Sequence, residues 1–363
     1  MALVFEIVPY VLKFKFEART SRGRLTEHKT WFIKVWDDAN PRVVGFGESA
    51  PFEGLSIDDT ADFDDKLYRN MRRLEGALMP SSLEQIENYV NMTDERLPSV
   101  RFGLETALRD LYFGGKQMIF DTPFFNGDKA IDINGLVWMG EKDVMLEHLE
   151  LKVMAGYECV KLKIGALDIE DELEIIRSAR EMLGNNSLTI RVDANGAYTE
   201  NQARLILKEL AKYNVQSIEQ PVKAGQHDAM QRLCKNTPVP VGLDEDLIGI
   251  CDLADKRALL ENIKPQYIIL KPTLLGGFKA TQEWITVAKE QGIGWWITSA
   301  LESNIGLNAI CQFTSQYNTK IPQGLGTGDL YVNNIPSPLT IDNGCIFWDQ
   351  KKHWYLKLAE RQA

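Results

Sequence analysis

The sequence predicts an α/β protein whose main domain is a closed (β/α) barrel of the TIM type. From residue 131 onward, short apolar strands alternate with amphipathic helices, which is typical of a parallel sheet. The alternation occurs seven or eight times, and that number favours a closed barrel over an open sheet. The first strand also lacks the glycine-rich turn that an open nucleotide-binding sheet would favour. The candidate strands are Ile133–Trp138, Cys159–Ile164, Leu188–Asp193, Val215–Glu219, Val239–Asp244, Tyr267–Lys271, Trp295–Ser299 and Gly324–Gly328.

The segment before the barrel, residues 1–125, predicts an α+β capping domain. Val4–Phe16 and Thr30–Trp36 have the composition and alternation of strands, and a polar connection joins them. Residues 57–116 carry apolar side chains at helical spacing. We therefore expect strands followed by helices in this domain.

The chain after the barrel, residues 332–363, returns to strand-like segments. These segments are Leu339–Ile341, Cys345–Trp348 and Trp354–Leu358. We predict that they fold back onto the capping domain and complete it. The barrel itself then occupies residues 126–331.

Composition excludes several functions for this chain of 363 residues. Its net charge is −10 and its acidic residues are dispersed, which argues against a nucleic-acid partner. No apolar run is long enough to span a bilayer, and the apolar N-terminus reads as a strand, so we expect a cytoplasmic protein without a membrane partner. Its five cysteines form no CxxC pair and its four histidines are scattered, which disfavours zinc. The oligomeric state stays open.

Two lysines lie on the second barrel strand. Lys161 and Lys163 are two residues apart, so they share one face, while the apolar residues between and beside them face the helices. The alternative is an amphipathic edge strand with two solvated lysines. That alternative suits an antiparallel sheet but not a parallel barrel, whose second face is the packed interior. We therefore expect both lysines inside the barrel.

Acidic residues end three successive strands. Asp193, Glu219 and Asp244 close the third, fourth and fifth strands, whose ends are neighbours around a barrel. Converging carboxylates repel one another unless a cation binds between them. Oxygen ligands without His or Cys favour Mg²⁺, with Mn²⁺ as the alternative. Separate roles as helix caps or ion-pair partners would not explain why the three acids are in register. The sequence therefore predicts a metal centre.

A third lysine, Lys271, ends the sixth strand and lies across the barrel from the second strand. Lysines beside a dication and beside one another should have depressed pKa values and can then act as bases. A metal bound to a carboxylate substrate can stabilise the enediolate that forms when the α proton leaves. The pattern therefore predicts proton abstraction α to the carboxylate of a small substrate.

Other polar residues are candidates for binding that substrate. Arg191 and Asn195 share a strand face with Asp193, and Ser299 ends the seventh strand. Arg22 lies in an N-terminal loop that we expect to close over the site and exclude water, with a solvated loop arginine as the alternative. The candidate substrate-binding residues are Lys161, Arg191, Asn195, Ser299 and Arg22.

Five motifs in this order resemble the enolase superfamily, in its muconate-lactonising subgroup. They are KLKIG at 161–165, RVDANGAY at 191–198, SIEQP at 217–221, GLDEDL at 242–247 and LKPTLLGG at 270–277. The resemblance covers essentially the whole chain. It implies an enolase-type modified barrel with a capping domain that the C-terminal segment completes.

The resemblance also implies roles for particular residues. Asp193, Glu219 and Asp244 take the positions of the metal ligands. Lys163 and Lys271 take those of the two acid/base residues, while Lys161 supports the first base and the substrate carboxylate. One departure is Asp246, where the subgroup usually has serine. We expect this added negative charge to leave the ligand set undisturbed.

Within the subgroup, three segments are similar to the branch that forms o-succinylbenzoate for menaquinone biosynthesis. They are the loop at 20–23, TSALESNIGL at 298–307 and QGLGTGDLY at 323–331. The resemblance implies a lyase that dehydrates 2-succinyl-6-hydroxy-2,4-cyclohexadiene-1-carboxylate. In this branch Lys163 would remove the α proton and protonate the departing hydroxyl on the same face. Lys271 would hold its charge against the ring and the enolate.

Other functions remain open. Dipeptide epimerases and N-succinylamino acid racemases use the same two lysines as opposed bases, and muconate cycloisomerisation is a third, weaker option. Dipeptide epimerases typically carry Asp-x-Asp after the eighth strand, where this chain has a single acid, Asp329. An inactive barrel kept as a binding protein would be expected to have lost a ligand or a lysine, and all of them are present.

Overall fold

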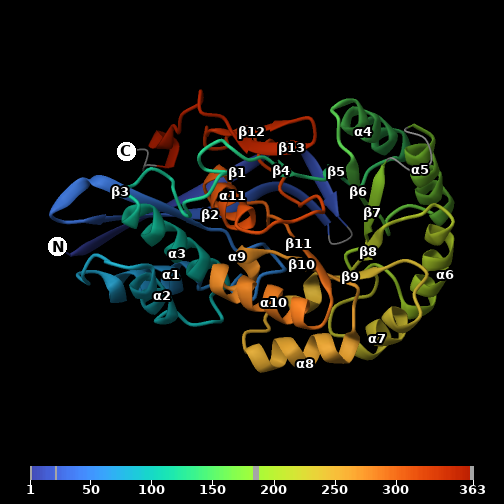
Figure 1. Cartoon of the computed structure of the whole chain (residues 1–363), viewed down its shortest axis with the longest axis horizontal. Helices are drawn as coiled ribbons and strands as arrows, with labels where there is room; N and C mark the ends of the chain where they lie inside the picture. The colour runs from blue at the N-terminus through green and yellow to red at the C-terminus, as the bar shows by residue number, and fades with distance from the viewer. Residues whose placement is uncertain (1, 21–22, 183–187, 360–363) are drawn as a thin grey trace.

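An antiparallel sheet and three helices form the N-terminal part of the protein (Figure 1). The computed structural model describes residues 2–20, 23–182 and 188–359. Strand β2 lies between β1 and β3, and helix α3 packs against β3. The elements are β1 (Leu3–Thr20), β2 (Gly23–Asp37), β3 (Asn40–Ser49), α1 (Phe63–Leu74), α2 (Leu83–Asn91) and α3 (Pro98–Tyr112).

Strand β3 was missing from the sequence prediction because glycines interrupt its apolar pattern. Those glycines let α3 approach the strand closely. A Cβ atom on Gly47 would lie 1.9 Å from the carbonyl oxygen of Gly103 in α3, and one on Gly45 would lie 2.2 Å from that of Ala107. The contact is therefore one of backbone against backbone.

We expect the substitution Gly47→Ala to lower the free energy of unfolding by about 3 kcal/mol, because the added methyl group forces β3 and α3 apart. Denaturant unfolding followed by circular dichroism measures the change. Gly140→Ala is the matched control, since its Cβ would meet nothing closer than 3.8 Å. Equal unfolding midpoints for the two variants would show that the close approach is not needed for stability.

Seven parallel strands, β5 to β11, form the barrel sheet in sequence order. In Figure 1 helices α4 to α8 lie along the outside of the curved strands. The strands are β5 (Gly135–Val137), β6 (Cys159–Lys163), β7 (Thr189–Asp193), β8 (Ser217–Glu219), β9 (Val241–Leu243), β10 (Tyr267–Leu270) and β11 (Gly294–Ile297). The helices are α4 (Lys142–Met154), α5 (Ile169–Met182), α6 (Glu200–Ala211), α7 (His227–Lys235), α8 (Leu253–Ile263), α9 (Pro272–Leu275), α10 (Phe278–Glu290) and α11 (Asn304–Ser315).

The eighth strand that the sequence predicted at Gly324–Gly328 is not formed. Two isolated bridges take its place, from Gln323 to Ile133 and from Gly324 to Thr298. They join the two ends of the seven-stranded sheet. Alternate glycines in this segment leave few side chains to pack on a pleated ladder, which accounts for the short pairing.

The C-terminal chain contacts both the barrel and the capping domain. Strands β12 (Leu339–Asp342) and β13 (Cys345–Trp348) form a small sheet with β4 (Ile131–Asp132), just before the barrel. Asn333 reaches β1, where its side chain donates to the carbonyl of Val11 and accepts from the amide of Lys13, each at 2.8 Å. The strand predicted at 354–358 is wrong, because a short 3-10 helix lies at 356–359 instead.

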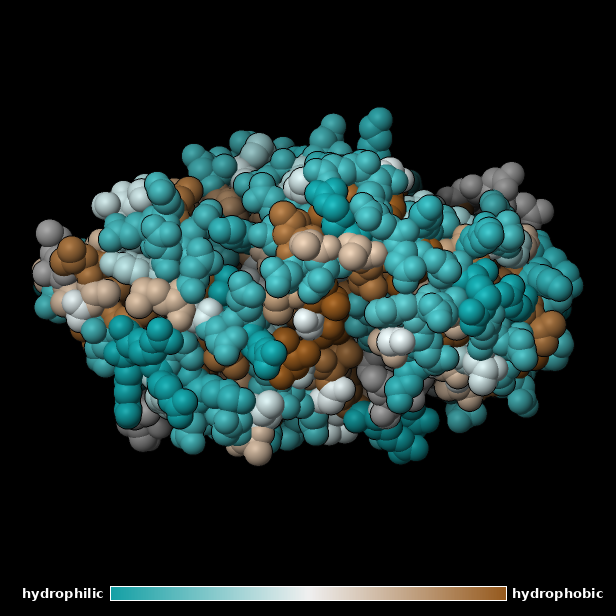
Figure 2. Space-filling view, turned by 90° about the horizontal axis from the view of Figure 1, so that it is seen from below, coloured by the Kyte–Doolittle hydropathy of each residue, from teal (hydrophilic) through white to brown (hydrophobic). Residues whose placement is uncertain are grey.

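None of the helices in the described parts of the chain combines the length and the apolar character needed to cross a membrane. On the face seen in Figure 2, hydrophobic residues gather near the middle and hydrophilic residues cover most of the rest.

Candidate active site

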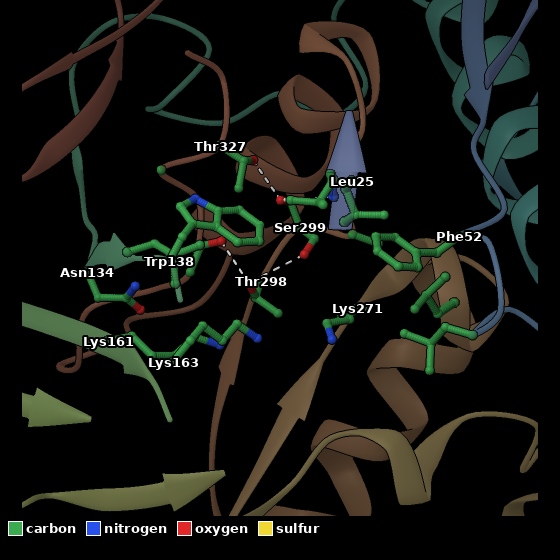
Figure 3. A pocket seen from close by; sticks show the side chains of 17 residues that line it. Leu25, Phe52, Asn134, Trp138, Lys161, Lys163, Lys271, Thr298, Ser299 and Thr327 are labelled. Carbon is green, nitrogen blue, oxygen red and sulfur yellow. Dashed lines mark hydrogen bonds between the residues drawn. The ribbon is translucent and has the colours of Figure 1, made fainter. Parts of the chain in front are cut away.

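A pocket opens where the C-terminal ends of the barrel strands meet the capping domain, with about 670 Å³ of empty space that includes its open mouth (Figure 3). Cations line it from two sides, since Lys161 and Lys163 come from β6 and Lys271 follows β10. Its apolar residues are Leu25, Phe52, Leu55, Leu136, Trp138, Leu274, Ala300 and Leu301. The remaining lining residues are Asn134, Thr298, Ser299, Gly324, Gly326 and Thr327.

The lysines of β6 form ion pairs with carboxylates of the next two strands. The Lys163 Nζ atom lies 2.5 Å from Asp193 Oδ2, and the Lys161 Nζ atom lies 3.1 Å from both Asp193 Oδ2 and Glu219 Oε2. Strand register explains this meeting, because Lys163 pairs with Asp193 and Asp193 pairs with Glu219 across neighbouring strands. Across the pocket, Lys271 forms an ion pair with Asp244.

The site lysines differ in basicity. Burial lowers the pKa of Lys163, and the charge of Lys161 adds to that effect against the attraction of Asp193. Burial alone would also lower the pKa of Lys161 and of Lys271, but nearby carboxylates outweigh it and raise both. The depressed pKa that we predicted for all the site lysines is therefore found at Lys163 alone among the three.

The three predicted metal-binding acids are buried together, with exposed fractions of 0% for Asp193, 1% for Glu219 and 2% for Asp244. Burial raises the pKa of Glu219 well above its usual value, and the charge of Asp193 raises it further. The pKa stays raised although Lys161 and Lys271 lower it, so added positive charge would stabilise the ionised carboxylates. The donor chemistry therefore fits a hard divalent cation.

Each of the three carboxylates is paired with a lysine ammonium group in this arrangement. As placed, no three His, Cys, Asp or Glu side chains among the described residues are grouped closely enough to hold a metal ion. A bound ion would take over contacts that the Asp193, Glu219 and Asp244 carboxylates make here with their lysine partners.

The other predicted site residues lie at different depths. Ser299 lines the pocket, and its hydroxyl is 2.6 Å from that of Thr327. Asn195 lies behind Lys163, accepting from its Nζ atom at 2.7 Å and donating to Glu245 at 2.9 Å. The predicted lid residue Arg22 falls outside the described residues.

Arg191 lies in the barrel core rather than in the wall of the pocket. It is 1% exposed, and its guanidinium stacks 4.1 Å from the centre of the Trp296 ring. It donates to Gln216 at 3.1 Å and to the carbonyl of Pro322 at 2.8 Å. These contacts join β7 to the segment that closes the barrel. Its predicted contact with substrate therefore has no support in this arrangement.

Asp246, the departure from the subgroup pattern, lies outside the group of three acids. It accepts hydrogen bonds from the side chain of Gln220 and from the amide of Gly225, each at 2.8 Å. Its charge is thus used to order a neighbouring loop.

Sequence reasoning missed most of the apolar wall. Leu25 and Phe52 come from the capping domain and Trp138 from the segment after β5. Phe52 and Trp138 lie in connections and Leu25 lies in β2, so no shared periodic pattern marks the three as one pocket wall. Gly324 and Gly326 line the pocket as well, and glycines allow a ligand to approach the backbone closely.

Comparisons with known proteins agree on one family. A family model for enolase C-terminal domain-like proteins matches residues 144–351. The chain is 44% identical over 358 residues to the o-succinylbenzoate synthase of Desulfotalea psychrophila, covering 92% of this chain and 96% of that one. A crystal structure of MenC from D. psychrophila LSv54 has a TM-score of 0.84 at 41% identity, covering 96% of this chain and all of that one (100%).

A more distant structure has the same fold. It is a dipeptide epimerase from Enterococcus faecalis V583, complexed with Mg and the dipeptide L-Leu-L-Tyr. Its TM-score is 0.81 at 19% identity, covering 96% of this chain and 97% of that one. At this identity the likeness shows the fold alone, an enolase-type barrel with a capping domain.

Proposed function

Because this chain belongs to the enolase superfamily, we propose that it is an o-succinylbenzoate synthase. This lyase dehydrates 2-succinyl-6-hydroxy-2,4-cyclohexadiene-1-carboxylate in menaquinone biosynthesis. The observation that carries the proposal is the 44% identity, over 92% of the chain, to a protein of that name. The pocket supplies matching chemistry, with a lysine of lowered pKa at an apolar cavity.

We assign the proton transfers to Lys163. Its neutral amine takes the α proton, and the resulting ammonium gives a proton to the departing hydroxyl on the same face. A C–H bond and a C–O bond break, the ring becomes aromatic and water leaves. Asp193 and Asn195 hold the Lys163 Nζ atom at 2.5 and 2.7 Å, which fixes where the amine points.

Asp193, Glu219 and Asp244 would hold a Mg²⁺ ion next to the substrate carboxylate. When bound, the ion supplies positive charge that stabilises the enediolate. Lys161 adds a second charge on the same side. Lys271, whose pKa is raised by the surrounding carboxylates against the effect of burial, stays charged and faces the ring.

The apolar wall and the hydroxyl groups of the pocket contact different parts of the substrate. Phe52, Trp138 and Leu274 present apolar surface that suits the ring and excludes water. We assign Ser299 and Thr327, at the ends of the last barrel segments, to polar contacts with the substrate.

A direct assay tests the function. Purified protein with Mg²⁺ should convert the cyclohexadiene carboxylate to the aromatic product, seen as a change in ultraviolet absorbance. Removal of divalent ions by a chelator should stop the reaction, and added Mg²⁺ should restore it. No conversion by the Mg²⁺-loaded protein would contradict the proposal.

Racemisation of N-succinylamino acids is the second candidate, because Lys163 and Lys271 face the pocket from opposite sides (Figure 3). Two bases on two faces are what a racemase requires. Dipeptide epimerisation has less support. The single acid of that region, Asp329, is 87% exposed, forms an ion pair with Lys15 and does not line the pocket.

We therefore expect Asp329→Ala to keep kcat/KM for dehydration within about twofold of the wild type, because an exposed ion pair contributes little. Steady-state kinetics measure this. The wild type should also leave the α protons of dipeptides unexchanged in deuterated water. Exchange that disappears in Asp329→Ala would instead show that this acid reads a substrate amine.

A further inference from the structure

The turn between β11 and α11 contains a strained residue in the pocket wall. Leu301 has a backbone φ of +69°, in the left-handed region that residues other than glycine rarely adopt. Its side chain lines the pocket and is only 8% exposed. It packs in one apolar cluster with Phe52, Trp138 and Leu274. A strained residue in a wall of this kind must be held by its surroundings.

Hydrogen bonds on both sides hold the turn. The Ala300 amide donates to Glu302 Oε2 at 2.9 Å, and the other oxygen of Glu302 accepts from the hydroxyl of Thr273. The Tyr331 hydroxyl donates to the carbonyl of Leu301 at 2.6 Å. These contacts attach the turn to the barrel. A different group binds the point where the turn joins α11.

That group is Glu48, which comes from β3 of the capping domain and is fully buried. It accepts from the amides of Ser303 and Gly306 at 2.8 and 2.9 Å, and from the hydroxyls of Ser303 and Thr30 at 2.5 and 2.9 Å. No lysine or arginine within the described residues forms an ion pair with it. The N–H groups of the N-cap residue Ser303 and of Gly306 in the first turn of α11 hold this carboxylate instead.

Ser303 connects the two systems. Its hydroxyl caps α11 by accepting from the Ile305 amide at 3.1 Å while donating to Glu48. It lies two residues after Leu301, so a shift of the helix start would move the strained residue. One link from the capping domain to the pocket wall therefore runs through this buried carboxylate.

We propose that Leu301 is a specificity-determining residue and that Glu48, acting through Ser303, is the positioning residue that holds it. The pocket then has its full apolar wall only when the capping domain is docked on the barrel. The inference rests on the proposed function for its substrate, a carboxylate that bears a flat ring.

Glu48→Gln tests the positioning role. The amide keeps the size of the carboxylate but turns an NH₂ group toward N–H donors. KM for the cyclohexadiene substrate should rise about tenfold while kcat changes less than about threefold, because binding geometry is lost and the base is untouched. Asp110→Asn is the matched control. Asp110 in α3 is as buried as Glu48. It accepts at 2.9 Å from the amide of Phe46, which lies in β3 as Glu48 does, but it does not line the pocket.

Two substitutions at Leu301 separate strain from contact. Leu301→Gly and Leu301→Ala both remove the side chain, but glycine tolerates the left-handed backbone, so Leu301→Gly should have the higher Tm. In the Leu301→Gly background, Glu48→Gln should change KM by less than about threefold, since no strained side chain remains to be held.

Three results would overturn the inference: an unchanged KM in Glu48→Gln, equal KM shifts in Glu48→Gln and Asp110→Asn, or an undiminished effect of Glu48→Gln in Leu301→Gly. A wild-type protein that fails to dehydrate would contradict the proposed function instead. In that case Tm is measured for the wild type, Glu48→Gln, Leu301→Gly and the double variant. A smaller loss of Tm from Glu48→Gln in the Leu301→Gly background than in the wild type would support the positioning of Leu301 by Glu48. An equal loss in both backgrounds would overturn it.

Discussion

Lys163→Arg should lower kcat for dehydration by about 10⁴-fold, whereas Lys271→Arg should keep measurable activity. An arginine stays protonated at neutral pH and cannot take the α proton. At position 271 only a fixed positive charge is required, and the guanidinium supplies it, although its planar shape fits imperfectly. Stopped-flow or steady-state absorbance of the diene measures both variants.

The two variants control for each other, since both introduce the same guanidinium beside a carboxylate partner. That partner is Asp193 for Lys163 and Asp244 for Lys271. Normal dehydration by Lys163→Arg would show that the base is assigned wrongly. If the wild type racemises N-succinylamino acids without dehydrating the diene, and both variants lose racemisation, the second candidate function takes its place.

Asp193→Asn should abolish Mg²⁺ binding at millimolar concentrations and lower kcat by about 10³-fold, because several kcal/mol of enediolate stabilisation are lost with the ion. Isothermal titration with Mg²⁺ and steady-state kinetics measure the two effects. The fold should survive, because asparagine keeps the size of the side chain and an oxygen that can accept from the Lys163 Nζ atom.

Asp246→Asn is the matched control for the metal prediction. Asp246 is 5% exposed and lies two residues beyond Asp244, yet its hydrogen bonds go to Gln220 and Gly225. This variant should bind Mg²⁺ as the wild type does. Full activity of the wild type after exhaustive chelation would contradict the metal role of the three acids.

The sequence by itself determined the fold class and the family, because both follow from features local to each strand. Enolase-type relatives confirm the predicted barrel with its capping domain. The spacing of Lys161 and Lys163 placed both on the inner face, and the structure shows them beside Asp193 and Glu219. Neighbouring parallel strands end at the same rim, so residues at strand ends converge whatever the loops do.

The pairing of the predicted eighth strand and the pKa values of the lysines depend on tertiary packing. The pattern of residues near Gly324 does not distinguish a full strand from an isolated bridge. The outcome depends on the pairing of this segment with Thr298. Burial and the number of carboxylates around an amine set its pKa, and those numbers follow from packing. That is why Lys163 and Lys271 shift in opposite directions although both end barrel strands.

Only the tertiary structure decided the shape of the pocket. Leu25 of β2 lies far along the chain from Phe52 and Trp138, which lie in connections, and the three share no periodic pattern. Glu48 looks like an ordinary strand residue until the capping domain places it at the start of α11. The physical reason is that side chains at strand ends are positioned by backbone hydrogen bonds between neighbours, whereas pocket walls are positioned by the docking of whole domains.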